Sequence, residues 1–210
     1  MKKRVLCYGD SNTWGYIAGS MGERYGEDIR WTSVMQSELG DSYTVLEQGY
    51  NGRTTVWEDS VDLRMSGYST FEMCLETASP VDLVVIMLGT NDTKCYFSAN
   101  EVNISVSVGR IAELALKSCC GVDGGAPEVL IVAPPLIENP KFDGMFDERS
   151  VSISKKFAEV FSVKAEELGV GFFDAARDTR PDPRDGVHSL PESHVELGRA
   201  MAAKVKEIIG

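Results

Sequence analysis

A serine and a histidine near opposite ends of the chain are of the types that nucleophilic catalysis requires. Ser11 lies in the segment GDSNTWG (9–15), directly after a short apolar run. A serine at such a turn attacks an acyl carbon when a neighbouring base removes its proton. Backbone N–H groups of the same turn are suited to binding an anion. The segment is also compatible with an ordinary polar turn that carries no chemistry.

His188 is the candidate base for Ser11. It ends the segment DGVH (185–188), where a spacing of three residues can bring a carboxylate and an imidazole to one side of a turn. Asp185 would accept a hydrogen bond from one ring nitrogen and leave the other nitrogen free to take the serine proton. The second histidine, His194, has a proline in place of an acid three residues before it. We therefore expect His194 to be a surface or helix-capping residue.

Two further polar turns could supply hydrogen-bond donors for a transition state. The segment GYNGRTT (49–55) follows a second apolar run, and Gly52 there could offer its backbone N–H at close range. The segment GTND (89–92) follows a third run. Asn91 could donate its side-chain amide to an oxyanion, and Asp92 could brace the loop. Taken singly, each segment is also compatible with an ordinary turn or a helix cap.

The segments between these turns alternate between strand-like and helix-like patterns. Short runs rich in Val, Ile and Leu predict buried parallel strands at 4–8, 43–47, 83–88, 128–133 and 170–173. Apolar residues at helical spacing predict helices at 32–39, 71–78, 103–118, 150–168 and 193–209. The alternation predicts a single α/β domain over 1–210. Its fold class is a flavodoxin-like three-layer sandwich, a five-stranded parallel sheet of order 2-1-3-4-5 with helices on both faces.

This strand order would bring the polar turns together. Strands one and three flank the topological switch point, where open α/β sheets bind their ligands. Ser11 follows strand one, Asn91 follows strand three, and Gly52 follows the adjacent strand two. The loop after strand five carries Asp185 and His188 and can reach back to the same edge. The sequence therefore predicts one site at the carboxyl edge of the sheet.

The four segments, in this order, resemble the four sequence blocks of the SGNH (GDSL-type) hydrolases across residues 4 to about 208. The family letters fall on Ser11, Gly52, Asn91 and His188, and Asp185 matches the acid three residues before the histidine. The resemblance implies a serine esterase with Ser11 as nucleophile, His188 as base and Asp185 as its partner. The oxyanion would be held by the Ser11 and Gly52 N–H groups and the Asn91 amide. The remaining expectations are that no metal or organic cofactor is needed and that the supporting residues are Asp10 and Asp92.

Finer features resemble the arylesterase and acyltransferase branch of that family. They are GDSxTWG at 9–15, RW at 30–31, RTT at 53–55, MLGTNDTK at 87–94 and LGxA at 197–200. Two positions depart from the pattern: Asn12 stands where the GDSL name expects leucine, and Gly52 stands where some acyltransferase-like relatives carry alanine. The branch implies a homo-oligomer that hydrolyses, and could transfer, short acyl groups of small-molecule esters.

The sequence also carries aromatic residues that could wall a narrow acyl pocket. Trp14, Tyr16 and Trp31 follow strand one, and 95–97 (CYF) follows strand three. Core packing is the alternative for these side chains. Long Gly- and Pro-containing segments after strands one and four, at 14–30 and 134–149, are expected to build the site.

Composition argues against several other functions. The net charge of −11 disfavours nucleic acid and anionic membranes as partners. No run approaches the ~20 apolar residues of a membrane span, and the run after the basic N-terminus is shorter than the roughly 7–15 residues of a signal peptide. Five cysteines without a CxxC motif are typical of reduced thiols, so we expect a cytoplasmic protein.

Three alternatives within the same chemistry stay open, because loop shape decides the substrate: a carbohydrate O-deacetylase, a lysophospholipase or a thioesterase. The alternative from a different class is a non-catalytic flavodoxin-like binding module. The first strand runs into GDSNTWG, not into GxGxxG, which argues against dinucleotide binding.

Overall fold

The computed structural model of the protein describes residues 2–142 and 144–210; Met1 and Asp143, the latter inside the predicted 134–149 loop, lie outside the described residues. One sheet contains five strands, namely β1 (Lys3–Gly9), β2 (Tyr43–Gly49), β3 (Leu83–Met87), β4 (Glu128–Ala133) and β5 (Gly171–Asp174). All neighbours pair in parallel. Their order is β2-β1-β3-β4-β5. The predicted fold class and strand order are confirmed.

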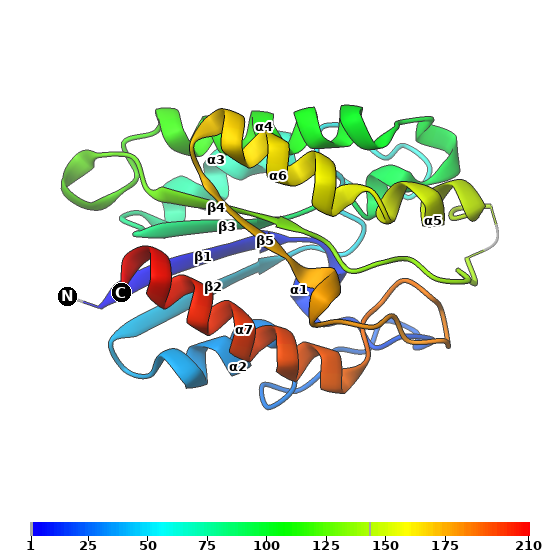
Figure 1. The fold of residues 1–210 in the computed structure, drawn as a ribbon, viewed down its shortest axis with the longest axis horizontal. Helices are drawn as coiled ribbons and strands as arrows, with labels where there is room; N and C mark the ends of the chain where they lie inside the picture. Colours follow the sequence, from blue (N-terminus) through cyan, green and yellow to red (C-terminus); the bar gives the residue numbers. More distant parts are fainter. Residues whose placement is uncertain (1, 143) are drawn as a thin grey trace.

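Helices cover both faces of the sheet (Figure 1). One face carries α3 (Gly67–Ala78), α4 (Glu101–Lys117), α5 (Glu148–Ser154) and α6 (Phe157–Leu168). The other face carries α2 (Trp31–Leu39) and α7 (Pro191–Ile209). The short α1 (Ser11–Trp14) directly follows β1. Single 3₁₀ turns lie at Asn91–Thr93, Cys95–Phe97, Val122–Gly124 and Ala175–Arg177. Within the described ranges, no helix is long and apolar enough to cross a bilayer.

The central strands are buried on both faces, and this explains their continuous apolar sequences. In β1, Leu6 and Tyr8 pack with the helices of one face, whereas Val5 and Cys7 pack with α2 and α7. The five residues of β3 are all buried. Burying one such side chain contributes roughly 1.5–3 kcal/mol, so the two-sided core fixes which residues of each strand face which layer.

The predicted single helix 150–168 is wrong, because the chain forms two helices there. α5 ends at Ser154, Lys155 and Lys156 form a turn, and α6 begins at Phe157. The Ser154 hydroxyl accepts a hydrogen bond from the Ile137 N–H at 3.1 Å, which ties the end of α5 to the loop after β4. The apolar spacing continues across this turn, so helical periodicity alone could not detect the break.

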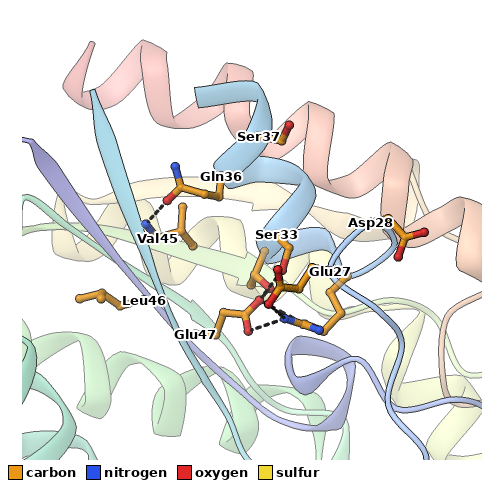
Figure 2. A pocket seen from close by; sticks show the side chains of 10 residues that line it. Glu27, Asp28, Ser33, Gln36, Ser37, Val45, Leu46 and Glu47 are labelled. Carbon is orange, nitrogen blue, oxygen red and sulfur yellow. Dashed lines mark hydrogen bonds and ion pairs between the residues drawn. The ribbon is translucent and has the colours of Figure 1, made fainter. Parts of the chain in front are cut away.

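β2 is one of the two edge strands of the sheet, and α2 shields part of it (Figure 2). The Gln36 amide accepts from the Val45 N–H at 2.7 Å and donates to the Tyr43 carbonyl at 3.3 Å. The Glu47 carboxylate accepts from the Arg30 guanidinium at 3.2 Å. Arg30, Gln36, Val45 and Glu47 border a surface groove of about 680 Å³ that contains none of the predicted site residues. Gln36 satisfies backbone groups of the strand edge, whereas Arg30, Thr32 and Ser33 bind the Glu47 carboxylate.

Candidate active site

The turn from β1 into α1 presents Ser11 at the carboxyl edge of the sheet. Asp10 caps α1, because its carboxylate accepts a hydrogen bond from the Asn12 N–H at 3.0 Å. Gly9 allows the sharp turn: a Cβ at this position would lie 2.0 Å from the Thr13 hydroxyl oxygen. Ser11 is therefore the first residue of a helical turn, with its side chain facing the loop that follows β5.

Three side chains form a continuous hydrogen-bonded row. The His188 Nε2 lies 2.9 Å from the Ser11 Oγ, and the His188 Nδ1 lies 2.7 Å from an Asp185 carboxylate oxygen. The other Asp185 oxygen accepts from the backbone N–H groups of Val187 at 2.9 Å and His188 at 3.0 Å. All three side chains are buried.

The environment of Asp185 favours its ionised form. Burial alone would raise the pKa of this carboxyl, but the hydrogen bond from the His188 ring, the charge of that ring and the backbone N–H groups hold the pKa below its usual value. An ionised Asp185 accepts from His188 Nδ1–H, which leaves Nε2 as a hydrogen-bond acceptor toward Ser11. The row therefore has the polarity needed to remove a proton from Ser11.

The His188 ring is held from several sides. Tyr16 stacks on it with ring centroids 4.4 Å apart, and Phe142 meets it edge-on at 6.0 Å. The buried Asn12 side chain binds the backbone on both sides of the histidine. Its oxygen accepts from the Ser189 N–H at 3.0 Å, and its amide donates to the Val187 carbonyl at 3.3 Å.

Asn12 thus ties the Ser11 turn to the loop that carries His188. The sequence pattern marked Asn12 only as a departure from leucine. These two hydrogen bonds could not be inferred from it, because their partners lie more than a hundred residues away along the chain.

The structure places Gly52 and Asn91 at the cavity that contains Ser11. Gly52 has a φ of +79°, and a Cβ there would lie 2.8 Å from the Arg64 side chain, so both conformation and space favour glycine. The Asn91 amide donates to the Arg53 carbonyl at 3.1 Å and approaches an Asp10 carboxylate oxygen at 3.5 Å. The longer contact is at the outer limit of a hydrogen bond, so the amide hydrogen that faces Asp10 is only weakly held.

Two buried carboxyl groups support the loops around the site. An Asp92 oxygen accepts from the Thr55 N–H at 2.8 Å and from its hydroxyl at 2.5 Å, which links the loops after β2 and β3. Burial raises the pKa of Asp92 to about 7. Burial also raises the pKa of Asp10 to about 6, against the opposing hydrogen bond from the Asn12 N–H and the charges of His188 and Arg53.

The cavity above Ser11 has a volume of about 410 Å³ and two chemically distinct sides. The apolar side is formed by Tyr16, by three residues of the loop after β4 (Phe142, Met145 and Phe146), and by Val187 of the loop that carries His188. A charged side is formed by Asp62, Arg64 and Lys94. The long segment 134–149 was expected to build the site, and it contributes three of these residues. The charged side had no signal in the sequence.

Most of the expected aromatic pocket residues lie elsewhere. Trp31 is buried in the core between α2, α7 and the sheet, because it begins α2 on the face that packs inward. Trp14 does not line the cavity, and residues 95–97 do not line it either; Phe97 instead packs near Trp57. Among the described residues, Tyr16 is the one member of the predicted aromatic wall that borders the cavity.

The expectation that His194 is a surface or capping residue is wrong. His194 is 1% exposed, because the start of α7 packs against the segment that carries Tyr25, whose ring meets the histidine edge-on at 5.3 Å. Among residues 2–142 and 144–210, neither ring nitrogen has a hydrogen-bond partner. Burial, followed by the charges of His188 and Arg30, lowers the pKa of His194 to about 4. The ring is therefore neutral near pH 7.

No group of three or more His, Cys, Asp or Glu residues in the described part of the chain is arranged to hold a metal ion. The chemistry that the site offers is that of its serine, imidazole, carboxylate and amide groups.

Comparisons with known proteins identify relatives over nearly the whole chain. Est24, a carbohydrate acetylesterase from Sinorhizobium meliloti, is 38% identical, covers 99% of this chain and 100% of its own, and has a TM-score of 0.94. The native aryl esterase of M. smegmatis is 37% identical, with coverages of 99% and 100% and a TM-score of 0.93. A carbohydrate acetylesterase family member from S. meliloti is 34% identical, with coverages of 99% and 99% and a TM-score of 0.90.

A comparison with curated proteins gives no match. The family model for the GDSL-like lipase/acylhydrolase family matches residues 7–195, a range that contains the Ser11 turn and the histidine loop. The expected resemblance is confirmed over most of the chain, and the protein belongs to the GDSL-like lipase/acylhydrolase family.

Proposed function

We propose that the chain is a serine-dependent carboxylic ester hydrolase in which Ser11 is the nucleophile, His188 the general base and Asp185 its orienting partner. One observation carries the assignment: Asp185, His188 and Ser11 form an unbroken row with contacts of 2.7 and 2.9 Å. Family membership supports the reaction class, since acylhydrolases cleave acyl esters.

In the first half of the reaction, the Ser11 Oγ attacks the ester carbonyl carbon while His188 Nε2 takes the hydroxyl proton. The tetrahedral intermediate collapses when the bond to the alcohol oxygen breaks, and His188 returns the proton to that oxygen. Asp185 stabilises the imidazolium formed between these two steps. Water then attacks the acyl-enzyme by the same proton transfers and releases the acid. An alcohol that takes the place of water would give acyl transfer.

Gly52 and Asn91 are the proposed oxyanion donors, together with the Ser11 backbone N–H. The support is their position: both line the cavity around Ser11, on loops that follow the strands beside β1. Asp10 and Asp92 are proposed to hold these loops. Donors fixed in place before the reaction stabilise the oxyanion without reorganising, which is why such positions matter most for the rate.

Short acyl groups are the proposed substrates. The cavity is about 410 Å³, and the aromatic rings of Phe142 and Phe146 line it. The solved relatives are named as an aryl esterase and carbohydrate acetylesterases. Both observations disfavour the lysophospholipase and thioesterase alternatives, whose long acyl chains need an extended channel.

A panel of p-nitrophenyl esters tests this function. We expect kcat/KM for the acetate to exceed that for the octanoate by roughly 10-fold or more, about 1.4 kcal/mol of transition-state stabilisation. A wild-type protein that hydrolyses none of the esters would contradict the proposed activity. A preference for octanoate would contradict only the acyl-length assignment.

A homo-oligomer is proposed on the strength of exposed apolar side chains near the cavity mouth. Val61, Leu63 and Met65 are 65%, 83% and 52% exposed on one loop, and Met73 of α3 is 63% exposed. Contiguous exposed apolar residues mark contact surfaces. Light scattering of the purified protein should give a mass above that of one chain, and a monomeric mass would contradict the proposal.

A further inference from the structure

Arg53 is a buried, charged residue that the proposed reaction does not use. It directly follows Gly52, is 5% exposed and does not border the cavity above Ser11. Its guanidinium lies over the Tyr8 ring, with 4.1 Å between the central carbon and the ring centroid. A guanidinium is stable in such a place only where hydrogen bonds and opposite charge compensate for the lost water. The contacts that Arg53 makes therefore indicate what it holds in place.

The side chain of Arg53 binds the end of β1. Its Nη1 donates to the Gly9 carbonyl at 2.8 Å and also to the Gln48 carbonyl of β2. The Gly9 carbonyl accepts a second hydrogen bond from the Tyr50 N–H at 3.1 Å. Ser11 lies two residues after Gly9, at the start of α1. The guanidinium therefore fixes the point from which the Ser11 turn begins.

The backbone of Arg53 binds another part of the site. Its N–H donates to the Tyr50 carbonyl at 3.0 Å, and its carbonyl accepts from the Asn91 side-chain amide at 3.1 Å. An amide nitrogen carries two hydrogens, so the hydrogen bond to Arg53 sets the direction of the other one. That second hydrogen faces an Asp10 carboxylate oxygen at the longer distance of 3.5 Å. It is the hydrogen that remains available to an oxyanion.

Opposite charges lie close together behind the proposed oxyanion donors. Burial raises the pKa of Asp10 and lowers the pKa of Arg53, and the charge of each residue opposes the shift in the other. An ionised Asp10 repels the negative charge that develops on the substrate oxygen, and the guanidinium offsets that repulsion. The positive charge of Arg53 thus favours the transition state as well as the folded loop.

We propose that Arg53 is a positioning residue for the oxyanion donors. Its guanidinium fixes the strand end that leads to Ser11, its carbonyl orients the Asn91 amide, and the preceding residue, Gly52, supplies the third donor. One residue thereby sets the separation of donors that follow three different strands. The inference rests on the ester hydrolase function and on the donor assignment proposed above.

Arg53→Met tests the inference, because it removes the guanidinium and keeps a long, unbranched side chain. We expect kcat for p-nitrophenyl acetate to fall by roughly 10- to 100-fold, since a displacement of about 1 Å at a catalytic group costs up to that factor. KM should change by less than about three-fold, because Arg53 positions donors that act mainly in the transition state. Denaturant unfolding of each variant establishes that it is folded.

The matched control is Arg4→Met, at the opposite end of β1. The Arg4 guanidinium also donates to a backbone carbonyl, that of Ala78, at 2.9 Å. This variant loses a similar contact far from the site and should keep the kcat of wild type. A kcat that falls equally in Arg4→Met and Arg53→Met would overturn the inference.

A double-mutant cycle with Asn91→Ala tests the route of the effect. The orientation that Arg53 gives to the Asn91 amide has no consequence once that amide is absent. Arg53→Met should therefore cost less than about three-fold in kcat when it is added to Asn91→Ala. A general structural defect costs the same factor in both backgrounds, so equal factors would overturn the inference.

Arg53→Lys is the second variant, and it decides the question if Arg53→Met does not fold. Lysine keeps the positive charge, but its shorter side chain and compact ammonium group cannot keep both carbonyl contacts and the contact with the Tyr8 ring. We expect kcat to fall by roughly 3- to 10-fold. A folded Arg53→Lys protein with the kcat of wild type would show that charge alone is sufficient and would overturn the positioning role.

The same assays separate this inference from the proposed function. Wild-type protein that hydrolyses no ester would contradict the hydrolase function. Hydrolysis by wild type, with an unchanged kcat in folded Arg53→Met protein, would contradict the positioning role of Arg53 alone.

Discussion

Replacing Asn12 with alanine removes both hydrogen bonds that hold the loop around His188. The Ser189 N–H and the Val187 carbonyl, at 3.0 and 3.3 Å from the Asn12 side chain, lose their partner. Leaving buried polar groups unpaired costs about 1–3 kcal/mol each, so the loss of both partners should lower the free energy of unfolding by about 2–6 kcal/mol. Part of this cost is relieved if the loop moves, and that movement displaces His188.

The catalytic consequence follows from the 2.9 Å contact between His188 Nε2 and Ser11 Oγ. A displacement of about 1 Å in a catalytic group can cost roughly 100-fold in rate, so kcat should fall by roughly 10- to 100-fold in Asn12→Ala. KM should change by less, because Asn12 positions the base and not the substrate. Asn12→Leu restores volume without the hydrogen bonds and should show a similar loss of kcat.

The assay is the initial rate of p-nitrophenyl acetate hydrolysis, with denaturant unfolding of each variant to establish that it is folded. Asn103→Ala, which alters an exposed asparagine of α4, is the matched control and should behave as wild type. A folded Asn12→Ala protein with kcat within about two-fold of wild type would refute the positioning role. Full activity in Asn12→Leu would show that packing, and not hydrogen bonding, holds the loop.

Three further outcomes follow from the site. Asn91→Ala should lower kcat by roughly 10²–10³ with a smaller change in KM, and the reverse pattern would make Asn91 a substrate-binding residue. Asp185→Asn should lose up to ~10⁴ in rate, far more than Asp182→Asn, and an equal loss in rate assays would contradict the assignment. The pKa of about 4 for His194 lies below that of the unfolded chain. As the pH falls, His194 is therefore protonated in the unfolded chain before it is protonated in the folded chain. The free energy of unfolding should fall by up to about 3 kcal/mol as the pH drops from above 6.5 toward 4. Unfolding curves at pH 7 and pH 5 should show a larger drop in the free energy of unfolding for wild type than for His194→Gln. Equal drops in the two proteins would refute the role of His194.

Sequence reasoning located the strands well because the sheet is buried on both faces. β4 has the predicted bounds, and the other strands differ by one or two residues at an end. The polar turns were also identified, since each directly follows an apolar run. The structure brings Ser11, Gly52, Asn91 and His188 to one edge, as the strand order required.

The remaining features depend on contacts between distant segments. The burial of His194 comes from packing against Tyr25, and the interior position of Trp31 comes from the direction in which α2 faces the core. Helical spacing does not distinguish either from an exposed or pocket residue. The charged side of the cavity arises because the loop carrying Asp62 and Arg64 folds over Gly52, and no local pattern encodes that approach.

The central claim is that Ser11 forms the acyl-enzyme, and labelling by a fluorophosphonate probe tests it most directly. The probe reacts with a serine whose proton is removed by a neighbouring base. Mass spectrometry of the wild-type protein should find the adduct on Ser11. Ser11→Ala should lose both the adduct and p-nitrophenyl acetate hydrolysis, whereas Ser20→Ala, which removes another serine of the cavity wall, should keep the adduct. An adduct on another residue, or Ser11→Ala protein that retains more than about a few per cent of the activity, would contradict the account.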